Sequence, residues 1–478
     1  MKRRKGSLGS ARATRRSKRV AVAEKVDDDV SESQQLGVSF DDIPSHITAH
    51  ILGRLPVKSV FICKSVCRRW KAVISDPHFP KLHFQHASAG LMILATDRKP
   101  TRNLYLLECE SEKIKNDDIG QFCCCEDSYI KPECNRHFKL EHKLKVPLDL
   151  DKSDEAKKRG GQSDDNKFAV VNSCNGFLCL SDVKRNCFVV CNPVTGEFIR
   201  LPEPPRIDRT GYTVRPELKV GFGFQPKTNE YKVVRIIFKG QRVWRATQKI
   251  MGVEIHTLGT STWRNVEVDP MHVSLYTFPT YVNGALYWIS GYHKKSSIFC
   301  FDFESESFQS FPYPPRSFVI DITMGEYGGS LYICNSSSTG HINMWIMKKY
   351  GFEASWTNIF SIDITSKPKG GLCWPVKHIK NGGAVLMCHS SDCFIYYEPL
   401  KYGFKIFKIR GAARYVTAIP HIPSLISLKD AVKGDNIEVM NVDPRCEELQ
   451  LQEEKEVLFF AKVNELTNLC YTSSVDEE

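Results

Sequence analysis

The feature that most constrains this chain is a run of short helical patterns from Phe40 to Phe84, which carries more apolar side chains than so small a unit can bury. Ile43, Ile47 and Ile51 recur every four residues, which places them on one stripe of a helix. Pro56 ends that helix, because proline removes an amide and disfavours helix at the residue before it. Units below roughly 40–50 residues rarely bury enough surface to fold alone. The surplus apolar face therefore predicts a partner, inside the chain or outside it.

A second helical pattern follows from Val57 to Ile74 and ends at Asp76-Pro77. The two helices together resemble a plant-type F-box. The matching residues, in order, are Ile43-Pro44, Ile51-Leu52, Leu55-Pro56-Val57-Lys58-Ser59, Val66-Cys67, Trp70 and Ile74-Ser75-Asp76-Pro77-His78-Phe79. One departure is Ile62-Cys63, where the family usually has Arg-Phe, and it leaves the apolar pattern in place. A plain helical hairpin that packs on the rest of the chain is the alternative interpretation.

The resemblance implies a partner and a role. Proteins with this motif dock on a Skp-type adaptor, which links them to the cullin and RING subunits of a ubiquitin ligase. Interface energy usually concentrates in a few buried aromatic and apolar anchors. We therefore predict adaptor contacts from the apolar residues of the motif: Ile43, Pro44, Ile47, Ile51, Leu52, Leu55, Pro56, Val57, Val60, Val66 and Trp70.

Composition bounds the class of protein. The 478 residues leave room for two or three domains, and a hydrophobic content of 42% is enough for a sizeable core. No apolar run approaches the roughly 18–20 residues of a membrane span, and the N-terminus lacks the apolar centre of a signal peptide. A soluble, intracellular protein with no membrane partner is expected. Its 18 cysteines are scattered, and we interpret those in strand-like runs as buried thiols: Cys174, Cys179, Cys187 and Cys191.

Positive charge is concentrated in the first 26 residues, which hold ten Lys or Arg and a single acid, Glu24. This tail carries +9 of the total charge of +11, so the rest of the chain is close to neutral. Its two basic clusters resemble a bipartite nuclear import signal: Lys2, Arg3, Arg4 and Lys5, then Arg15, Arg16, Lys18 and Arg19. A polyanion-binding arm and a merely solvated tail are the alternatives. Specific nucleic-acid binding is not expected, because no aromatic residues are interleaved for base stacking.

Beyond the helices the pattern changes to strands. Residues 90–107 are predicted to form two strands around a Lys-Pro turn. Residues 149–167 are charged and contain glycine, with almost nothing to bury, so they predict a surface loop or a disordered insertion. From Phe168 onward, strand patterns alternate with turns.

A repeat emerges when these turns are aligned. Asn175-Gly176, Asn283-Gly284, Gly328-Gly329 and Gly382-Gly383 each precede an apolar strand, and their second glycines are 108, 45 and 54 residues apart. Such dipeptides supply the positive φ that a tight hairpin needs. A unit missing from the long gap is supplied by strand patterns at residues 220–224, 231–236 and 252–256. Strand repeats of roughly 45–50 residues predict a β-propeller with about four strands per blade.

This half of the chain also resembles a family, the interaction domain associated with plant F-boxes. The matching residues are 171–179, 191–196, 221–224, 229–234, 263–264 and 282–288. The match is strong over about residues 168–315 and rests on pattern alone over 316–428. The resemblance implies a Kelch-like fold that holds the protein to be ubiquitinated.

Two other motifs predict no site. Gly221-Phe222-Gly223-Phe224 lacks the third glycine and the following helix of a nucleotide-binding loop, and strand ends explain it. Cys123-Cys124-Cys125, with Cys134, His137 and His142 nearby, fits no common zinc-ligand spacing. No metal is therefore predicted.

Catalysis is not predicted either. No nucleophile, base and orienting group form a recognisable signature, and no cofactor motif is present. The isolated histidines at 256, 272 and 421 are interpreted as turn or surface residues rather than ligands.

The last fifty residues differ in character from the repeats. They are acidic from Glu447 to Glu456, and the apolar residues that follow predict a partly helical stripe: Leu458, Phe459, Phe460, Val463, Leu466 and Leu469. Packing against the propeller and a short partner-binding helix are the two interpretations.

The sequence thus predicts an α plus all-β protein with four parts: a disordered basic tail (1–38), a small helical F-box (39–85), a Kelch-like β-propeller (90–428) and an acidic, partly helical tail (429–478). The expected function is the non-catalytic substrate-recognition subunit of a Skp–cullin–F-box ubiquitin ligase, in the nucleus, the cytoplasm or both, which recruits an unknown target protein. One rival is a ligase-independent nuclear scaffold that uses the basic tail. The other is a propeller enzyme, which convergent acidic or histidine side chains in the central channel would indicate.

Overall fold

A computed structural model describes residues 43–96, 103–107, 142–145, 169–182, 186–205, 218–239, 248–269, 271–273, 275, 278–290, 297–315, 322–336, 341–349, 355–363, 372–379, 384–389, 393–398, 403–409, 415–434, 438–441 and 460–462. Contacts divide the chain into two units, Met1–Pro44 and Ser45–Glu478. The second unit contains the helices and all of the sheets described below.

The chain after Pro44 opens with four short helices, here called the helical segment: α1 (Ser45–Leu52), α2 (Val57–Lys64), α3 (Arg68–Ile74) and α4 (Phe79–His86). The prediction of one continuous helix from Val57 to Ile74 is wrong, because that stretch is broken between α2 and α3. Cys67 has an extended backbone at the break (φ −153°, ψ 161°). Its Sγ accepts a hydrogen bond from the Trp70 N–H at 3.4 Å, so the thiol caps α3.

A small core holds the four helices together. Leu52, Val60, Ile74 and Phe79 are buried against one another. The side chain of His83 in α4 lies 3.0 Å, through Nε2, from the carbonyl oxygen of Leu55 just after α1. Each helix therefore contributes to the core, and a polar contact joins the last helix to the end of the first.

Three sheets make up the first half of the strand-rich region. Each is antiparallel, with strands in the order given. The first is β25 (Tyr415–His421), β1 (Gly90–Thr96), β2 (Asn103–Leu107) and β3 (His142–Lys145). The second is β4 (Ala169–Cys174), β5 (Phe177–Asp182), β6 (Cys187–Cys191), β7 (Glu197–Arg200) and β26 (Met440–Asn441). The third is β8 (Leu218–Gln225), β9 (Glu230–Phe238), β10 (Gln248–Thr257) and β11 (Arg264–Val266), and β12 (His272–Val273) also pairs with β10.

Three further sheets complete the region. The fourth is β13 (Thr280–Val282), β14 (Ala285–Ser290), β15 (Ser297–Asp302) and β16 (Ser307–Pro312). The fifth is β17 (Ile322–Tyr327), β18 (Ser330–Ser336), β19 (His341–Met347) and β20 (Trp356–Asp363). The sixth is β21 (Cys373–Ile379), β22 (Ala384–His389), β23 (Cys393–Glu398), β24 (Gly403–Ile409) and β27 (Phe460–Lys462).

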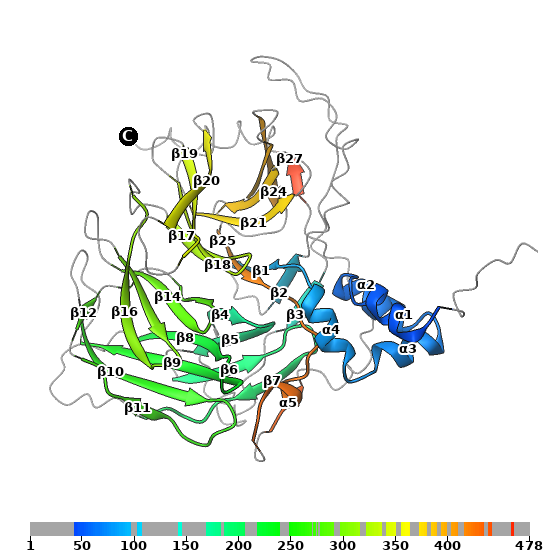
Figure 1. The fold of residues 1–478 in the computed structure, drawn as a ribbon, viewed down its shortest axis with the longest axis horizontal. Helices are drawn as coiled ribbons and strands as arrows, with labels where there is room; N and C mark the ends of the chain where they lie inside the picture. The colour runs from blue at the N-terminus through cyan, green and yellow to red at the C-terminus, as the bar shows by residue number, and fades with distance from the viewer. Residues whose placement is uncertain are drawn as a thin grey trace, which may run out of the picture. The chain divides into compact units, whose positions relative to one another are not determined.

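The six sheets of the described chain are the blades of a β-propeller, and they follow one another around a common centre (Figure 1). The innermost strands contact one another in turn: β25 with β4, β4 with β8, β8 with β13, β13 with β17, and β17 with β21. The ring closes in the first blade, where the late strand β25 pairs with the early strand β1 from Gly90↔His421 to Thr96↔Tyr415. The predicted fold class, helices followed by a β-propeller, is confirmed.

The repeat predicted from the turns corresponds to the same position in three of the blades. Each of these turns joins the first strand of a blade to the second, and both of its residues have positive φ. The turns are Asn175-Gly176, Asn283-Gly284 and Gly328-Gly329. Gly382-Gly383 lies outside the described residues. The strands predicted for the long gap are β8, β9 and β10.

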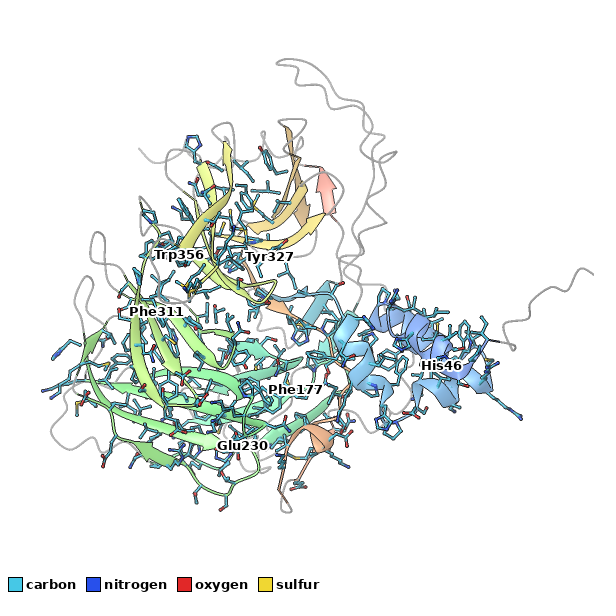
Figure 2. The ribbon with its side chains drawn as sticks, viewed as in Figure 1. His46, Phe177, Glu230, Phe311, Tyr327 and Trp356 are labelled. Atoms are coloured by element: carbon cyan, nitrogen blue, oxygen red, sulfur yellow. The ribbon has the colours of Figure 1, made fainter. Side chains whose placement is uncertain are left out.

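Neighbouring blades pack closely at two glycines of β8. A Cβ atom at Gly221 would lie 2.6 Å from Leu286 Cδ1, and one at Gly223 would lie 2.1 Å from Phe303 Cε2. Both partners come from the next blade. These glycines therefore serve blade packing, in agreement with the interpretation of the Gly-Phe-Gly-Phe motif as part of a strand. Phe177, labelled in Figure 2, is fully buried and meets the ring of Tyr231 at 5.2 Å between centroids.

The C-terminal region adds to the propeller at the described positions. A short helix, α5 (Leu428–Ala431), follows β25, and β26 and β27 each pair with the outer strand of a blade, β7 and β24. The prediction of helix through Phe460 is wrong, since Phe460–Lys462 is a strand that completes a sheet edge. An unpaired sheet edge favours pairing of this kind over an isolated short helix.

The helical segment contacts the propeller through α2. Val57 is buried in the same apolar cluster as Met92 and Leu178, and Phe61 packs against that cluster. Leu425, between β25 and α5, packs against both this cluster and the helical core. Part of the apolar surplus predicted for the helices is thus covered inside the chain.

Several predictions fall outside the described residues: the basic tail, the insertion at 149–167, the cysteine-rich stretch from Cys123 to His137, and most of the acidic tail. Within the described ranges, no cluster of three or more metal-ligating side chains is found. No helix among those ranges is both long and apolar enough to cross a bilayer.

Candidate functional site

The helical segment exposes four large aliphatic side chains, here called the exposed aliphatic face. Ile47 and Ile51 lie one turn apart on α1 and are 43% and 52% exposed. Ile62 on α2 is 45% exposed, and Val66, just after α2, is 61% exposed. Isolated exposed aliphatic residues are ordinary, but four within twenty residues of sequence on such small helices indicate a surface that a partner covers.

Half-buried residues accompany this face. Leu55, Pro56 and Trp70 are each partly exposed, and Leu55 and Trp70 also pack against the helical core. Ile43 and Pro44 precede α1 in the sequence, and Ile43 is partly exposed while Pro44 is exposed.

Three of the predicted contact residues are buried instead. Leu52 and Val60 belong to the helical core, and Val57 belongs to the cluster shared with the propeller. Side chains at 2%, 0% and 3% exposure do not reach a partner in this conformation. These three side chains pack inside the chain, and the exposed and half-buried residues are the members of the predicted set that are accessible in this structure.

A second candidate site is a cavity of about 290 Å³ in the propeller. Most of its described lining comes from the innermost strands β4, β13, β17, β21 and β25 and their adjoining turns, and Ala89, just before β1, also lines it. We call it the axial cavity. The lining includes Ser173, Phe278, Asn283, Glu326, Trp374 and His421.

Glu326 supplies the one charged side chain among the described residues of this lining. Its Oε1 accepts a hydrogen bond from the Gly329 N–H at 2.6 Å, which fixes the carboxylate at the turn after β17. No hydrogen bond or ion pair to Oε2 occurs within the described part of the chain, so that oxygen retains acceptor capacity. Phe278, on the same lining, is 62% exposed, and Trp374 is partly exposed.

His421 is the one histidine among the described residues of the axial cavity. It is 1% exposed, and its Nδ1 lies 2.9 Å from the Ser173 Oγ. Burial lowers the pKa of His421 to about 3, so the ring is neutral at physiological pH. The sequence interpretation of His421 and His256 as turn or surface residues is wrong, since both are buried strand residues; His256 Nδ1 lies 3.1 Å from the Thr262 carbonyl oxygen.

The Ser173–His421 pair lacks two features of a catalytic serine–histidine pair within the part of the chain that the structure describes. A ring with so low a pKa is a weak base at neutral pH, whereas a general base works best with a pKa near the operating pH. His421 Nε2 has no hydrogen-bond partner in the described structure, so no carboxylate orients the ring. The rival hypothesis of a propeller enzyme thus gains no support from the axial cavity.

The buried cysteines of β4, β5 and β6 add no nucleophile. Cys174, Cys179 and Cys191 are buried as predicted, whereas Cys187 is exposed at the start of β6, contrary to the prediction. Burial raises the pKa of Cys191 to about 12, and it raises the pKa of Cys174 and Cys179 as well. These thiols therefore stay protonated and unreactive.

Comparison with known families accounts for both halves of the chain. Residues 40–82 match the F-box domain, and residues 136–431 match the F-box associated beta propeller domain. The chain belongs to the plant F-box proteins with this associated domain. The predicted F-box and its associated Kelch-like domain are confirmed.

Curated relatives agree with this family. The chain is 27% identical over 444 residues to the F-box protein At3g07870 of Arabidopsis thaliana, which covers 84% of this chain and 95% of that protein. It is 25% identical over 357 residues to the F-box protein CPR1 of the same plant, covering 68% of this chain and 74% of that protein. A solved structure titled "Structure of YjhT" aligns with 57% of this chain and 96% of its own at 11% identity, but a TM-score of 0.30 supports no conclusion.

Sequence reasoning missed two features of this F-box protein. Ile62 was noted as a departure from the F-box pattern, yet the structure places it on the exposed aliphatic face, where its burial by a partner is favourable. The signal that could have identified Ile62 is the replacement of a charged residue by an aliphatic one at a helix position that is expected to be exposed. The axial cavity had no such signal, because its described lining residues come from six separate stretches of sequence.

Proposed function

We propose that this F-box protein is the substrate-recognition subunit of a Skp–cullin–F-box ubiquitin ligase. The observation that supports the proposal is the exposed aliphatic face of Ile47, Ile51, Ile62 and Val66, on the domain that matches the F-box. An F-box implies binding to a Skp-type adaptor, and an aliphatic face of this kind gains free energy when an adaptor covers it. The adaptor in turn connects the chain to the cullin and RING subunits.

The proposed mechanism is proximity. The F-box anchors the chain to the ligase while the propeller binds a target protein, which raises the effective concentration of the target near the ubiquitin donor. The chain itself performs no chemistry in this scheme.

The test is an affinity purification from native cells with the wild-type chain and an Ile51→Asp/Val66→Asp variant, read by mass spectrometry. Both residues are more than half exposed, so the substitutions should leave the fold intact. Two buried charges at an interface should weaken adaptor binding by about 100-fold or more. Adaptor and cullin should then appear with the wild type alone, and proteins recovered with both baits are candidate targets.

A matched control is Ile359→Asp, which places the same charge at an exposed aliphatic residue of the propeller strand β20. It should retain the adaptor. Equal recovery of adaptor by the wild type and the double variant contradicts the proposed interface. Failure of the wild type to recover any adaptor contradicts the ligase function and favours a scaffold that acts through the basic tail.

We further propose that the basic tail directs the chain to the nucleus. The support is the spacing of its two basic clusters in the sequence, residues 2–5 and 15–19. Replacing the eight Lys and Arg of these clusters by Gln in a fluorescent fusion of the full chain should shift it to the cytoplasm. An unchanged distribution contradicts the import role.

A further inference from the structure

The axial cavity has a chemical character that the proposed function does not use. Glu326 brings one negative charge to a lining in which no Lys, Arg or Asp occurs among the described residues. One oxygen of this carboxylate is held by the Gly329 N–H, and the other keeps its acceptor capacity. The cavity is thus preorganised to accept a donor and to repel an anion.

Aromatic side chains border the same space. Phe278 and Trp374 both line the cavity, and both expose ring surface to solvent. An exposed fraction of 62% is high for a phenylalanine and indicates a surface that binding would cover. Aromatic faces attract cations through the ring quadrupole, so these rings and the carboxylate favour the same kind of ligand.

Size and chemistry narrow the ligand. A volume of about 290 Å³ admits one long side chain but no folded element. A metal ion is disfavoured, since no group of three metal-ligating residues is found among the described residues. The turn that carries the carboxylate is joined to the turn of the neighbouring blade, because Asn283 Nδ2 donates a hydrogen bond to the Gly329 carbonyl oxygen at 2.9 Å.

We propose that the axial cavity binds a Lys or Arg side chain presented by the target protein, with the charge on Glu326 and the aliphatic stem against Phe278 and Trp374. This inference rests on the proposed function, because it assigns the target side of the receptor. It commits the propeller to targets that carry an exposed basic segment and excludes those that would present an acidic one.

The experiment uses the full-length chain and a display library of short random peptides, followed by fluorescence anisotropy of the selected peptides. Peptides selected by the wild type should be enriched in Lys or Arg at one position. Replacing that residue by Gln should weaken binding by about tenfold or more. Glu326→Gln keeps the acceptor for the Gly329 N–H, removes the charge and should weaken binding equally.

Combining the Gln-substituted peptide with the Glu326→Gln chain shows whether the two groups contact each other or affect binding independently. If the cation pairs with Glu326, the neutral peptide should bind wild type and Glu326→Gln alike. Glu267→Gln is the matched control, because Glu267 is an exposed acid beyond β11 that does not line the cavity. It should leave the affinity unchanged. Phe278→Ala should weaken binding of the basic peptide as a second, uncharged test of the same site.

Three outcomes overturn the inference: selection without basic residues, equal binding by wild type and Glu326→Gln, or binding that appears only after the eight basic residues of the tail are replaced by Gln. The last result would mean that the chain's own tail occupies the cavity. Each is distinguishable from failure of the proposed function, since adaptor recovery is measured separately and Glu326→Gln should retain it.

Discussion

The helical segment and the propeller satisfy the hydrophobic effect in opposite ways. The helices share a core of only four fully packed side chains and leave Ile47, Ile51, Ile62 and Val66 exposed. The propeller buries its large apolar residues in several clusters between blades and presents a cavity whose described lining contains one carboxylate. The exposed aliphatic face of the helices can be covered by any apolar surface of matching shape. The cavity of the propeller, under the proposal above, selects its ligand by charge.

This difference fits two separate tasks. An aliphatic face favours a constant partner, because apolar burial is strong and carries little chemical discrimination. A carboxylate in a small cavity favours discrimination, because the wrong charge leaves it unpaired or repelled. Two kinds of substitution test this division of tasks between the helices and the propeller. One compares buried with exposed residues of the helices, and the other compares neutral with charged groups in the cavity.

The largest effect is expected at adjacent residues of α1. Leu52→Ala should cost about 2–5 kcal/mol of stability in the helical segment, because it opens a cavity in a small core. Ile51→Ala should cost less than about 0.5 kcal/mol, because that side chain is half exposed. Hydrogen exchange of the helical amides in the full chain measures both.

Adaptor affinity should not follow stability in this pair. Ile51→Ala should weaken adaptor binding by about tenfold, as expected for an anchor at an interface, although the fold is intact. Ile359→Ala, on the propeller, serves as control and should change neither quantity. Equal stability losses at Leu52 and Ile51 would contradict the division of α1 into a buried and an exposed side.

Leu52 and Ile51 also show how much of the helical segment can be predicted from the sequence. The period of four correctly placed Ile47 and Ile51 one turn apart on a helix, whereas Ile43 precedes α1. The order of motifs identified the F-box. Periodicity does not say which apolar side faces the chain's own core and which faces a partner. Val57 and Val60 were therefore grouped with the exposed residues, although tertiary packing buries them.

The propeller was predictable wherever local chemistry determines the structure. Asn-Gly at 175–176 and 283–284 adopts the positive φ of a tight turn, so the blade repeat is visible in the sequence. Pairing of β1 with β25 joins opposite ends of the propeller and has no local signal, so closure of the ring was not predicted. For the same reason Glu326, Phe278 and Trp374 could not be assembled into one cavity from sequence.

A pH-dependent effect is expected from His421 in the cavity lining. Its pKa falls from an ordinary 6.5 to about 3 on folding, because burial disfavours the charged ring. The unfolded chain therefore binds more protons between these values, and the contribution to stability, complete above pH 6.5, is lost as the pH falls toward 3. The loss is at most about 1.4 kcal/mol per pH unit for this group. Denaturant unfolding at several pH values measures it.

His421→Gln removes the titrating ring and should flatten this slope. Ser173→Ala is the matched control, because it deletes the hydroxyl bonded to Nδ1 and keeps the ring, so the slope should persist. His83 and His256 also have pKa values lowered mainly by burial, so part of the slope remains in either variant. A slope that His421→Gln leaves unchanged would show that the ring is solvated in solution.

The smallest effect is expected at the break between α2 and α3. Cys67 caps α3 with a thiol, a weak acceptor, at 3.4 Å from the Trp70 nitrogen. Cys67→Ser should strengthen the cap by about 0.5 kcal/mol, and Cys67→Ala should weaken it by a similar amount, because hydroxyl oxygens are preferred at this position. Exchange of the Trp70 amide should slow in the first variant and quicken in the second. Since the helical core is so small, even this change in capping free energy should be measurable in the helices, whereas the amides of the propeller sheets should exchange as in the wild type. Equal exchange at Trp70 in the wild type and both variants would show that tertiary packing alone positions α3.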